Sequence, residues 1–249
     1  MKVSIITVTF NSEKYLEHTI LSLLEQTYKN IEYIVIDGKS TDNTMSIIKK
    51  YENRIDKIIS EKDNGMFDAL NKGMAIATGD IIGVLHSDDI FNSPDVIESV
   101  VRAFEENKVD TLYGDLEYVY PEDINKLYRI WKSKTFKRSN FHWGWMPAHT
   151  TFYFKRSLLE KYGNYETHYF SSADYEFMSR YLYKFKLSSF YLPKLIVRMR
   201  RGGLSNNNIY KRLRANRRDY LAMKVNGVPF AFIVSILKPL SKLHQYYKK

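Results

Sequence analysis

The chain has 249 residues, 44% of them hydrophobic, which is enough for one sizeable core or for one core with a small appendage. It contains no cysteine, so disulfides, thiolate metal sites and a cysteine nucleophile are excluded, and any metal must be held by oxygen or imidazole ligands. The net charge is +10, but residues 184–249 contain 16 Lys or Arg and one acid, Asp219, which makes them +15 and leaves residues 1–183 at about −5. We therefore expect the two parts to meet different partners.

The apolar runs of the chain are too short to cross a bilayer. A spanning helix needs roughly 18 or more apolar residues, and the longest late run, Val228–Leu237, is about half that. The first ten residues predict a strand, because polar residues follow before a signal-peptide core is complete. The sequence therefore predicts a protein that does not span a membrane.

Strand-like and helix-like patterns alternate over the first hundred residues. Apolar and β-branched runs predict strands at Lys2–Thr9, Ile31–Ile36, Ile55–Ile59 and Asp80–Leu85. Helical patterns are found at Glu13–Gln26, from a cap at Ser40 or Thr41 to about Tyr51, at Gly65–Ala77, and from Pro94 to about Glu106. This alternation predicts an α/β fold with a Rossmann-like, mixed but mainly parallel sheet and helices on both faces.

The pattern becomes less regular after the fourth helix. Thr111–Tyr120 is typical of a strand or a hairpin arm, Thr151–Phe154 of a short strand, and helices are expected near Leu158 and Tyr175. Residues 121–150 are rich in aromatic and basic side chains without a clear period. A break at residues 202–206 precedes a basic helix, so we divide the chain into a domain of residues 1–205 and a helical extension of residues 206–249.

Polar residues follow four of the predicted strands. They are Thr9-Phe10-Asn11, Asp37-Gly38-Lys39-Ser40, the loop 61–65, and Ser87-Asp88-Asp89. Ligands of an open parallel sheet bind outside the carboxyl ends of its strands, so these groups are expected on one rim. Carboxylates there can accept hydrogen bonds from a base and a ribose, but they repel phosphates unless a divalent cation lies between them. Taken singly, each group is also typical of an ordinary turn.

Five segments carry a family resemblance. They are VSIITVTFN at 3–11, IVIDGKSTDNT at 34–44, EKDNGMFDALNKGMAIATGDIIGVLHSDD at 61–89, PAHTTFYFKRSLLEKYG at 147–163 and SADYEF at 172–177. In this order and spacing they resemble glycosyltransferase family 2, and more narrowly its bacterial branch that builds O-antigen and capsule repeat units. The resemblance covers about residues 1–205. It implies a catalytic domain of GT-A fold that takes a sugar from a nucleotide diphosphate donor.

Position by position, the resemblance implies a donor site at the rim of the sheet. Thr9, Phe10 and Asp37 would surround the base and the ribose, with Asn11 next to them. Asn71, on the helix that follows Gly65, would lie beside the nucleotide.

The resemblance also implies a metal cofactor, Mn²⁺ or Mg²⁺. Asp88 would contact the ribose or the metal, and Asp89 would be the direct metal ligand. The ion would act chiefly as a Lewis acid on the departing diphosphate. The chain departs from the family at His86, where many members have the first aspartate of a DxD motif. An imidazole can bind a transition metal or a phosphate, so the choice of metal stays open.

Inversion at the anomeric centre by direct displacement is likewise implied, and this reaction needs one general base for the acceptor hydroxyl. Asp174 matches the position of that base, and a carboxylate at a helix start is accessible. From the residues alone, Asp174 could equally be a helix N-cap. Glu176 is the second choice, although it would point to a different side of the helix.

Three further features have both a functional and a structural interpretation. His149 could lie near the donor phosphates or the acceptor, or it could be structural. Arg200, with Arg198 and Arg201, could reach the diphosphate or form a solvated basic edge. The aromatic run 142–145 could stack on an acceptor sugar or pack in the core.

The helical extension predicts contact with an anionic membrane surface. An apolar stripe of Tyr210, Leu213, Tyr220 and Leu221 alternates with arginines and lysines, and the apolar run 228–237 ends in further lysines. A packed helix with a solvated basic face is the alternative. We expect a cytoplasmic enzyme attached peripherally to the inner face of the plasma membrane, where the resemblance places a polyprenyl-linked glycan acceptor.

The sequence thus predicts transfer of a single hexose, from a UDP-sugar according to the resemblance, because the chain lacks both the QxxRW motif and the spanning helices of processive synthases. A sugar-phosphate nucleotidylyltransferase is one rival, but it would open with a Gly-rich loop, and no glycine precedes Gly38. A nucleic-acid-binding protein would suit the pI of 9.4. Acids at the strand ends would repel a phosphate backbone, so no nucleic acid is expected as partner.

Overall fold

The structure is a computed structural model that describes residues 1–202 and 209–241. The predicted boundary at residues 205 and 206 lies outside the described residues, as do the side chains of residues 203–213 and 239–249, which include Tyr210 and Leu213 of the predicted stripe.

The chain alternates strands and helices as predicted over its first hundred residues. The strands are β1 (Val3–Thr9), β2 (Ile31–Asp37), β3 (Lys57–Ser60), β4 (Ile81–Val84), β5 (Ile90–Phe91), β6 (Thr111–Tyr120), β7 (Asp123–Trp131), β8 (Tyr153–Lys155) and β9 (Ser189–Arg200). The α-helices are α1 (Leu16–Leu24), α2 (Thr44–Lys50), α3 (Met66–Ile76), α4 (Val96–Asn107), α5 (Leu158–Tyr162), α6 (Ala173–Met178), α7 (Ile209–Val225) and α8 (Ala231–Ser241). Shorter helical turns are η1 (Glu52–Arg54), η2 (Arg138–Trp143), η3 (His149–Thr151), η4 (Thr167–Ser172) and the π-helical η5 (Ser179–Lys184).

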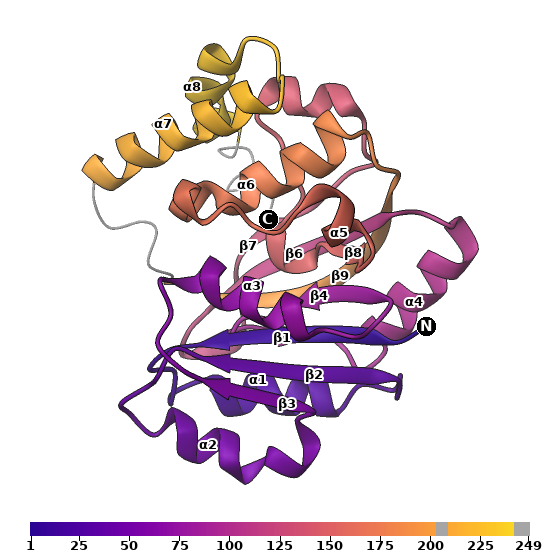
Figure 1. The fold of residues 1–249 in the computed structure, drawn as a ribbon, viewed down its shortest axis with the longest axis vertical. Helices are drawn as coiled ribbons and strands as arrows, with labels where there is room; N and C mark the ends of the chain where they lie inside the picture. Colours follow the sequence, from indigo (N-terminus) through magenta and orange to yellow (C-terminus); the bar gives the residue numbers. More distant parts are fainter. Residues whose placement is uncertain (203–208, 242–249) are drawn as a thin grey trace.

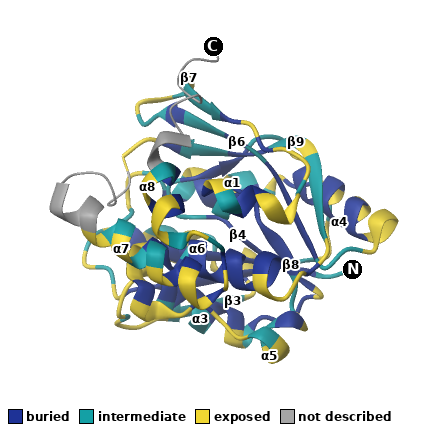
Figure 2. Cartoon of the chain, turned by 90° about the horizontal axis from the view of Figure 1, so that it is seen from above, coloured by how far each residue is buried: buried dark blue, intermediate teal, exposed yellow. Residues whose placement is uncertain are grey.

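The described strands form one nine-stranded mixed sheet in the order β3-β2-β1-β4-β8-β6-β9-β5, with β7 paired to β6. β3, β2, β1 and β4 are parallel to one another, and β8 joins β4 and β6 in antiparallel pairing. Helices α1 and α4 lie on one face, and α3, α5 and α6 on the other (Figures 1 and 2). This confirms the predicted fold class.

The register of the parallel strands fixes where their polar ends lie. Thr9 of β1 pairs with Asp37 of β2, and Asp37 pairs with Ser60 of β3. Because parallel strands share a direction, these carboxyl ends meet at one edge of the sheet. The predicted rim is therefore present.

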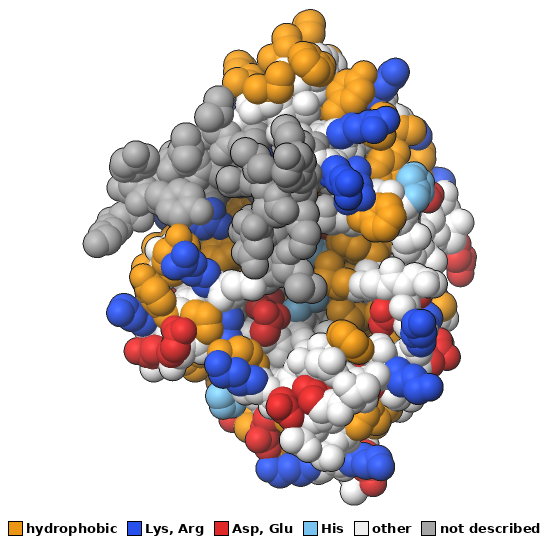
Figure 3. Space-filling model, turned by 90° about the vertical axis from the view of Figure 1, so that its left-hand side faces the viewer, with side chains coloured by type: hydrophobic (Ala, Val, Ile, Leu, Met, Phe, Trp, Pro, Cys, Tyr) orange, Lys and Arg blue, Asp and Glu red, His pale blue; other side chains and the backbone are white. Residues whose placement is uncertain are grey.

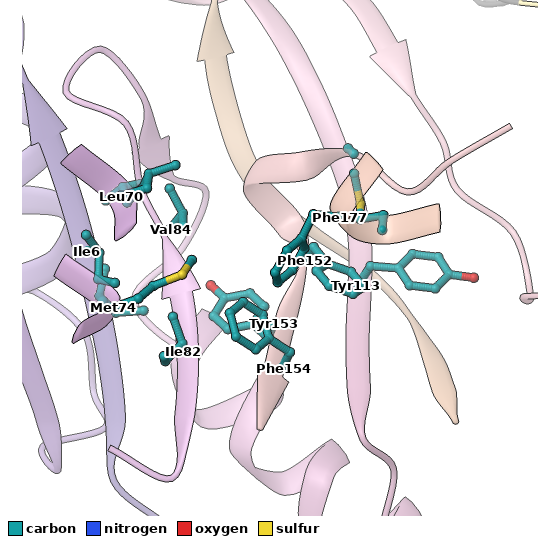
Figure 4. Close-up of a cluster of buried hydrophobic side chains, with 14 of the residues drawn as sticks. Ile6, Leu70, Met74, Ile82, Val84, Tyr113, Phe152, Tyr153, Phe154 and Phe177 are labelled. Atoms are coloured by element: carbon teal, nitrogen blue, oxygen red, sulfur yellow. The ribbon is translucent and has the colours of Figure 1, made fainter. Parts of the chain in front are cut away.

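On the α3 side of the sheet, the core is packed so closely that position 83 requires a glycine. Leu70 and Met74 of α3 cover the sheet, and Tyr153 of β8 lies against β4 (Figure 4). A Cβ on Gly83 would lie 2.3 Å from Cε1 of Tyr153, so only glycine fits there. The antiparallel strand β8 thus joins the parallel half of the sheet to the second half.

Three strands and one helix start differ from the prediction. β5, β7 and β9 were not predicted: β5 has two residues, and most side chains of β7 and β9 are only partly buried, so they lack a clear apolar run. The predicted caps Ser40 and Thr41 do not start α2, which begins at Thr44. The Ser40 hydroxyl instead donates to Asp37 Oδ1 at 2.5 Å.

At the opposite end of β2, Glu32 is a buried carboxylate that should make stability depend on pH. Burial alone would raise the pKa of Glu32, but hydrogen bonds from Ser4, Thr78 and Lys57 lower it overall. Since the folded pKa lies below the unfolded one, this contribution is present at neutral pH and is lost as pH falls through the carboxyl range. We expect Glu32→Gln to lower the melting temperature at neutral pH and to differ less from wild type below about pH 4. A pH-independent difference in calorimetric melting would contradict this.

The helical extension packs on the rest of the chain. The buried side chains of α7 include Asp219, Ala222 and Met223, and Asn226 directly after α7 is buried as well, whereas Leu221 is exposed. α7 contacts α6 and η4, and α8 contacts η2. In the described part of the chain, no helix is both long and apolar enough to span a bilayer.

Candidate active site

Two loops at the rim place an aromatic ring and a carboxylate around Gly38. A Cβ on Gly38 would lie 2.6 Å from Asp63 Oδ2 and 3.3 Å from Cδ2 of Phe10, so the absence of a side chain lets these two groups approach. The Phe10 ring is 61% exposed. Asp63, which also accepts a hydrogen bond from the Gly65 N–H at 2.9 Å, was not singled out from the sequence, although its loop was.

Below this ring, Asp37 and Thr9 form the floor of the rim. Asp37 is fully buried, and its carboxylate accepts hydrogen bonds from the hydroxyls of Ser40 at 2.5 Å and Ser60 at 2.6 Å. The buried Thr9 hydroxyl has no hydrogen-bond partner among the described residues. Asp37 therefore joins the loop after β2 to the end of β3. The Thr9 hydroxyl can still form a hydrogen bond at this rim.

Asn11 connects the loop after β1 to the loop after β2. It has a left-handed backbone conformation with φ of 49°. Its Oδ1 accepts a hydrogen bond from the Thr41 N–H at 2.9 Å, and its own N–H donates to Ser40 Oγ at 2.8 Å. These contacts shape the rim next to Phe10.

The turn after β4 directs its two aspartates differently. Asp88 is half-buried, whereas Asp89 is 0% exposed, and neither of its carboxyl oxygens has a hydrogen-bond partner within the described chain. Burial raises the pKa of Asp89 well above its usual range, and Asp88 adds to this against a smaller opposing effect of Arg200. The role of Asp89 as the direct metal ligand stays a prediction, and Asp88 is the more exposed of the two carboxylates.

Arg200 supports this turn from β9. Arg200 is 3% exposed, and its Nη1 donates to the Asp88 carbonyl at 2.5 Å. Its Nη2 lies 3.1 Å from His18 Nδ1, and its guanidinium stacks on the Tyr15 ring at 4.5 Å. Both Nη groups are thus directed at protein groups, whereas Nε has no hydrogen-bond partner within the described residues, and binding of the diphosphate by Arg200 stays a prediction. Arg198 pairs with Glu117, and Arg201 stacks on Tyr128.

Asn71 also has a structural position. Its Nδ2 donates to the Tyr165 carbonyl at 2.9 Å, and its Oδ1 accepts from the Tyr165 N–H at 3.0 Å. This two-sided pairing ties α3 to the segment before α6. Each polar end of the Asn71 side chain keeps one further hydrogen-bonding position, and its contact with a nucleotide stays a prediction.

Two histidines form a bridge from β4 towards the second half of the site. The rings of His86 and His149 are 5.7 Å apart, and His149 Nε2 lies 2.7 Å from the Tyr165 hydroxyl. Burial lowers the pKa of both imidazoles to about 4, and for His86 the neighbouring His149 contributes as well. Both rings are therefore neutral at pH 7, and His149 has a polar partner rather than a solvated position.

The predicted base lies on the far side of this bridge. Asp174 is the second residue of α6, and the N-cap position belongs to Ser172, so the capping alternative is ruled out. Its Oδ1 accepts the N–H of Tyr175 at 2.7 Å. Burial is the main cause that raises the pKa of Tyr165, and the negative charge of Asp174 raises it further. The two side chains therefore interact electrostatically. Tyr165, which the sequence did not single out, thus joins His149 to Asp174.

Glu176 is excluded as an alternative base by its contacts. It is 2% exposed and pairs with Arg180, whose Nη2 lies 2.9 Å from Oε2. Arg180 also donates to the carbonyls of Tyr162 and Asn164, and Nδ2 of Asn226, directly after α7, lies 3.3 Å from Glu176 Oε1. The pair holds the segment before α6 and the extension together.

This buried pair gives a stability prediction. Removing one partner leaves the other charge buried and unpaired, so we expect Glu176→Ala to lower the free energy of unfolding by about 3–5 kcal/mol. Glu160→Ala, which removes an exposed acid of α5, should change it by no more than about 0.5 kcal/mol. Urea unfolding of the two variants checks this, and equal effects would show that the pair is not important for stability.

The aromatic run 142–145 divides between surface and core. Trp145 packs among Tyr113, Phe136 and Phe141 with ring centroids 5.7 to 6.3 Å apart. Trp143 is exposed. Of the two, Trp143 alone is placed to contact an acceptor.

A mainly parallel sheet with polar strand ends on one rim is the arrangement of a nucleotide-binding α/β domain. The model of the family "Glycosyl transferase family 2" matches residues 4–163. The chain belongs to this family, as the sequence predicted.

Individual relatives agree with this assignment. An uncharacterized glycosyltransferase of Mycobacterium tuberculosis is 35% identical over 181 residues, which is 72% of this chain and 68% of the relative. A PGL/p-HBAD biosynthesis glycosyltransferase of Mycobacterium bovis is 26% identical over 224 residues, covering 84% of this chain and 80% of the relative.

Solved structures share the fold. TarS 1–349 of S. aureus in complex with UDP-GlcNAc has a TM-score of 0.67 at 20% identity and covers 99% of this chain and 78% of that one. The likeness spans only 44% of the longer TarS chain. The mannosyltransferase PcManGT of Pyrobaculum calidifontis, in complex with GDP-Man and Mn²⁺, has a TM-score of 0.64 at 16% identity and covers 98% and 75% of the two chains.

Proposed function

We propose that this enzyme transfers one hexose, with inversion, from a UDP-sugar to a hydroxyl of a polyprenyl-linked glycan during bacterial surface polysaccharide synthesis. The observation that carries the proposal is the arrangement of two carboxylates. Asp88 is half-buried in the turn after β4, and contacts of His86 with His149 and of His149 with Tyr165 lead from this turn towards Tyr165, whose pKa is raised in part by the charge of Asp174. Donor binding and deprotonation of an acceptor can therefore take place in one site.

The donor half of the site suits a nucleoside. The exposed Phe10 ring offers a face for a base, and the nearby Asp63 carboxylate can accept hydrogen bonds from a base N–H or a ribose hydroxyl. The unpaired Thr9 hydroxyl adds a further polar contact. Two solved S. aureus TarS structures with this fold are complexes with UDP-GlcNAc and with UDP, which favours uridine for this chain.

The residues present also fit a divalent cation. Mg²⁺ and Mn²⁺ in nucleotide sites need only one or two protein ligands, because phosphates and waters supply the rest. Residues 1–202 and 209–241 contain no cluster of three or more His, Asp or Glu that could hold a metal alone, so substrate phosphates would have to complete the set. Asp88 would hold Mn²⁺ or Mg²⁺, with the neutral His86 in the same turn. When bound, the ion stabilises negative charge on the diphosphate.

The reaction follows from the positions of the two carboxylates. Asp174 accepts the proton of the acceptor hydroxyl as that oxygen forms its bond to the anomeric carbon. The bond from this carbon to the diphosphate oxygen breaks on the opposite face, and the nucleotide diphosphate leaves with the electron pair. A single displacement of this kind inverts the anomeric configuration.

Calorimetric titration with UDP, with and without Mn²⁺, tests the donor assignment, with GDP as the comparison. We expect UDP to bind in the presence of the metal and GDP to bind more weakly. The same protein would then be screened for transfer from UDP-sugars to polyprenyl-linked acceptors. If neither nucleotide binds with or without metal, the donor site is wrongly assigned.

A further inference from the structure

The hairpin of α7 and α8 exposes an apolar surface that the fold does not use. We call it the hairpin patch, and it consists of Leu221, Val225, Phe230, Phe232, Ile233 and Ile236. Phe230 is 77% exposed and Phe232 66%. Figure 3 shows hydrophobic side chains gathered at the end of the molecule that α7 and α8 form, with Lys and Arg side chains next to them.

The hairpin already has a separate inner face. Ala222 and Met223 of α7 and Val234 of α8 are buried against the rest of the protein, as is Val228 between the helices. The hairpin patch lies outside this core, so it adds nothing to folding. Contiguous exposed apolar side chains on a folded protein typically mark a binding surface.

The charges around the hairpin patch are of one sign. Arg214, Arg217 and Lys224 of α7 are exposed. The only acid in residues 184–249 is Asp219, and it is buried and paired with Lys238 at 2.7 Å. Exposed bases beside exposed apolar side chains, with no neighbouring exposed acid on the hairpin, complement a surface that is apolar inside and anionic outside.

We propose that the hairpin patch docks on an anionic lipid bilayer, with its Phe and Ile side chains inserted at the headgroup level and its bases against lipid phosphates. α8 has 11 residues and is thus about 16 Å long, about half the hydrocarbon thickness, so it lies in the plane of the interface. A second copy of the chain is a poorer occupant, because a two-fold contact through this patch would bring like charges together. The hairpin patch includes Leu221 of the predicted stripe and four residues of the predicted apolar run 228–237.

Buried contacts fasten the hairpin to the helix that carries Asp174. Lys238 Nζ of α8 lies 3.7 Å from the ring centroid of Tyr175, and Asn226, in the turn between α7 and α8, contacts Glu176. Tyr175 and Glu176 follow Asp174 directly in α6. Docking would therefore set the orientation of α6 relative to the bilayer. Only this orientation rests on the proposed function; the bilayer contact itself does not.

Flotation of the full chain with vesicles tests the proposal. We expect binding to phosphatidylcholine vesicles that contain phosphatidylglycerol, weaker binding to phosphatidylcholine alone, and weakening by salt. The triple variant Phe230→Ser/Phe232→Ser/Ile233→Ser should lower the apparent partition coefficient by about tenfold or more. The double variant Arg217→Gln/Lys224→Gln should lower this coefficient only on anionic vesicles. The matched controls are Leu21→Ser/Leu127→Ser and Lys49→Gln/Lys132→Gln, which change exposed residues of other elements.

Three results would overturn the proposal. They are no binding of wild type to anionic vesicles, binding of the triple variant equal to wild type, and a wild-type dimer in light scattering that the triple variant converts to a monomer. The last would show that the hairpin patch is an interface between copies. UDP titration of the same samples separates this outcome from failure of the proposed function, because vesicle binding does not require a nucleotide.

Discussion

Asp174→Asn is expected to reduce sugar transfer by about 10²–10⁴-fold, the range that a general base contributes, and to leave the affinity for UDP unchanged. The amide keeps the size and the backbone hydrogen bond of Asp174, but it cannot accept the proton of the acceptor hydroxyl. Because Asp174 is separated from the rim by the bridge of histidines and Tyr165, its loss should not disturb the donor. Transfer is measured with the donor and acceptor identified in the screen, and UDP binding by calorimetry.

Two variants make this result specific to Asp174. Glu166→Gln removes an exposed acid of the segment before α6 and should leave transfer unchanged. Asp174→Glu keeps a carboxylate but moves it, so it should retain a fraction of the activity. Asp174→Asn with activity near wild type would exclude Asp174 as the base. An equal loss in Glu166→Gln would point to a general change of the segment.

The parallel half of the fold could be predicted from the sequence because its strands are buried along most of their length. β1, β2 and β4 form continuous apolar runs, which set their positions and place their polar ends on one rim. β7 and β9 could not be predicted in this way. Their side chains are mostly half exposed, and β9 contains Pro193, so their pairing with β6 depends on contacts distant in sequence.

The site residues were predicted in part for the same reason. Motif spacing places Thr9, Asp37 and Asp88 at strand ends, but it does not say which way a side chain in a turn points. The partners that occupy Asn71 and Arg200 are likewise invisible in the sequence, because the contacts of Asn71 with Tyr165 and of Arg200 with Asp88 join distant parts of the chain. The sequence does contain a signal for Asp63, namely Gly38. This residue has no side chain, which allows the Asp63 carboxylate to approach it.

The packed face of α7 shows a related limit. Asp219 in α7 and Asn226 directly after it are buried and polar, so an apolar stripe does not identify the packed face. Each is buried only because a specific partner satisfies it, Lys238 for Asp219 and Glu176 for Asn226. Neither pairing can be derived from helical periodicity.

Asp88→Asn is expected to abolish the metal-dependent part of UDP binding, with at least a tenfold loss of affinity in Mn²⁺, because an amide oxygen is a much poorer ligand for a hard cation than a carboxylate. Asp89→Asn, at the neighbouring position, is the matched control variant. Asp89 is 0% exposed and its raised pKa favours the neutral acid, so an amide of the same shape should preserve UDP binding. Calorimetry in Mn²⁺ and in EDTA compares the two variants with wild type.

The pair of variants decides between the two carboxylates. If Asp89→Asn loses metal-dependent binding and Asp88→Asn keeps it, the inward position of Asp89 is not the one that binds the donor, and the turn after β4 must rearrange when the nucleotide enters. If both lose it equally, the neutral buried carboxyl is needed to hold Asp88 in place. A circular dichroism melt of Asp89→Asn separates this from unfolding, because a loss of binding without a fall in melting temperature can only come from the site.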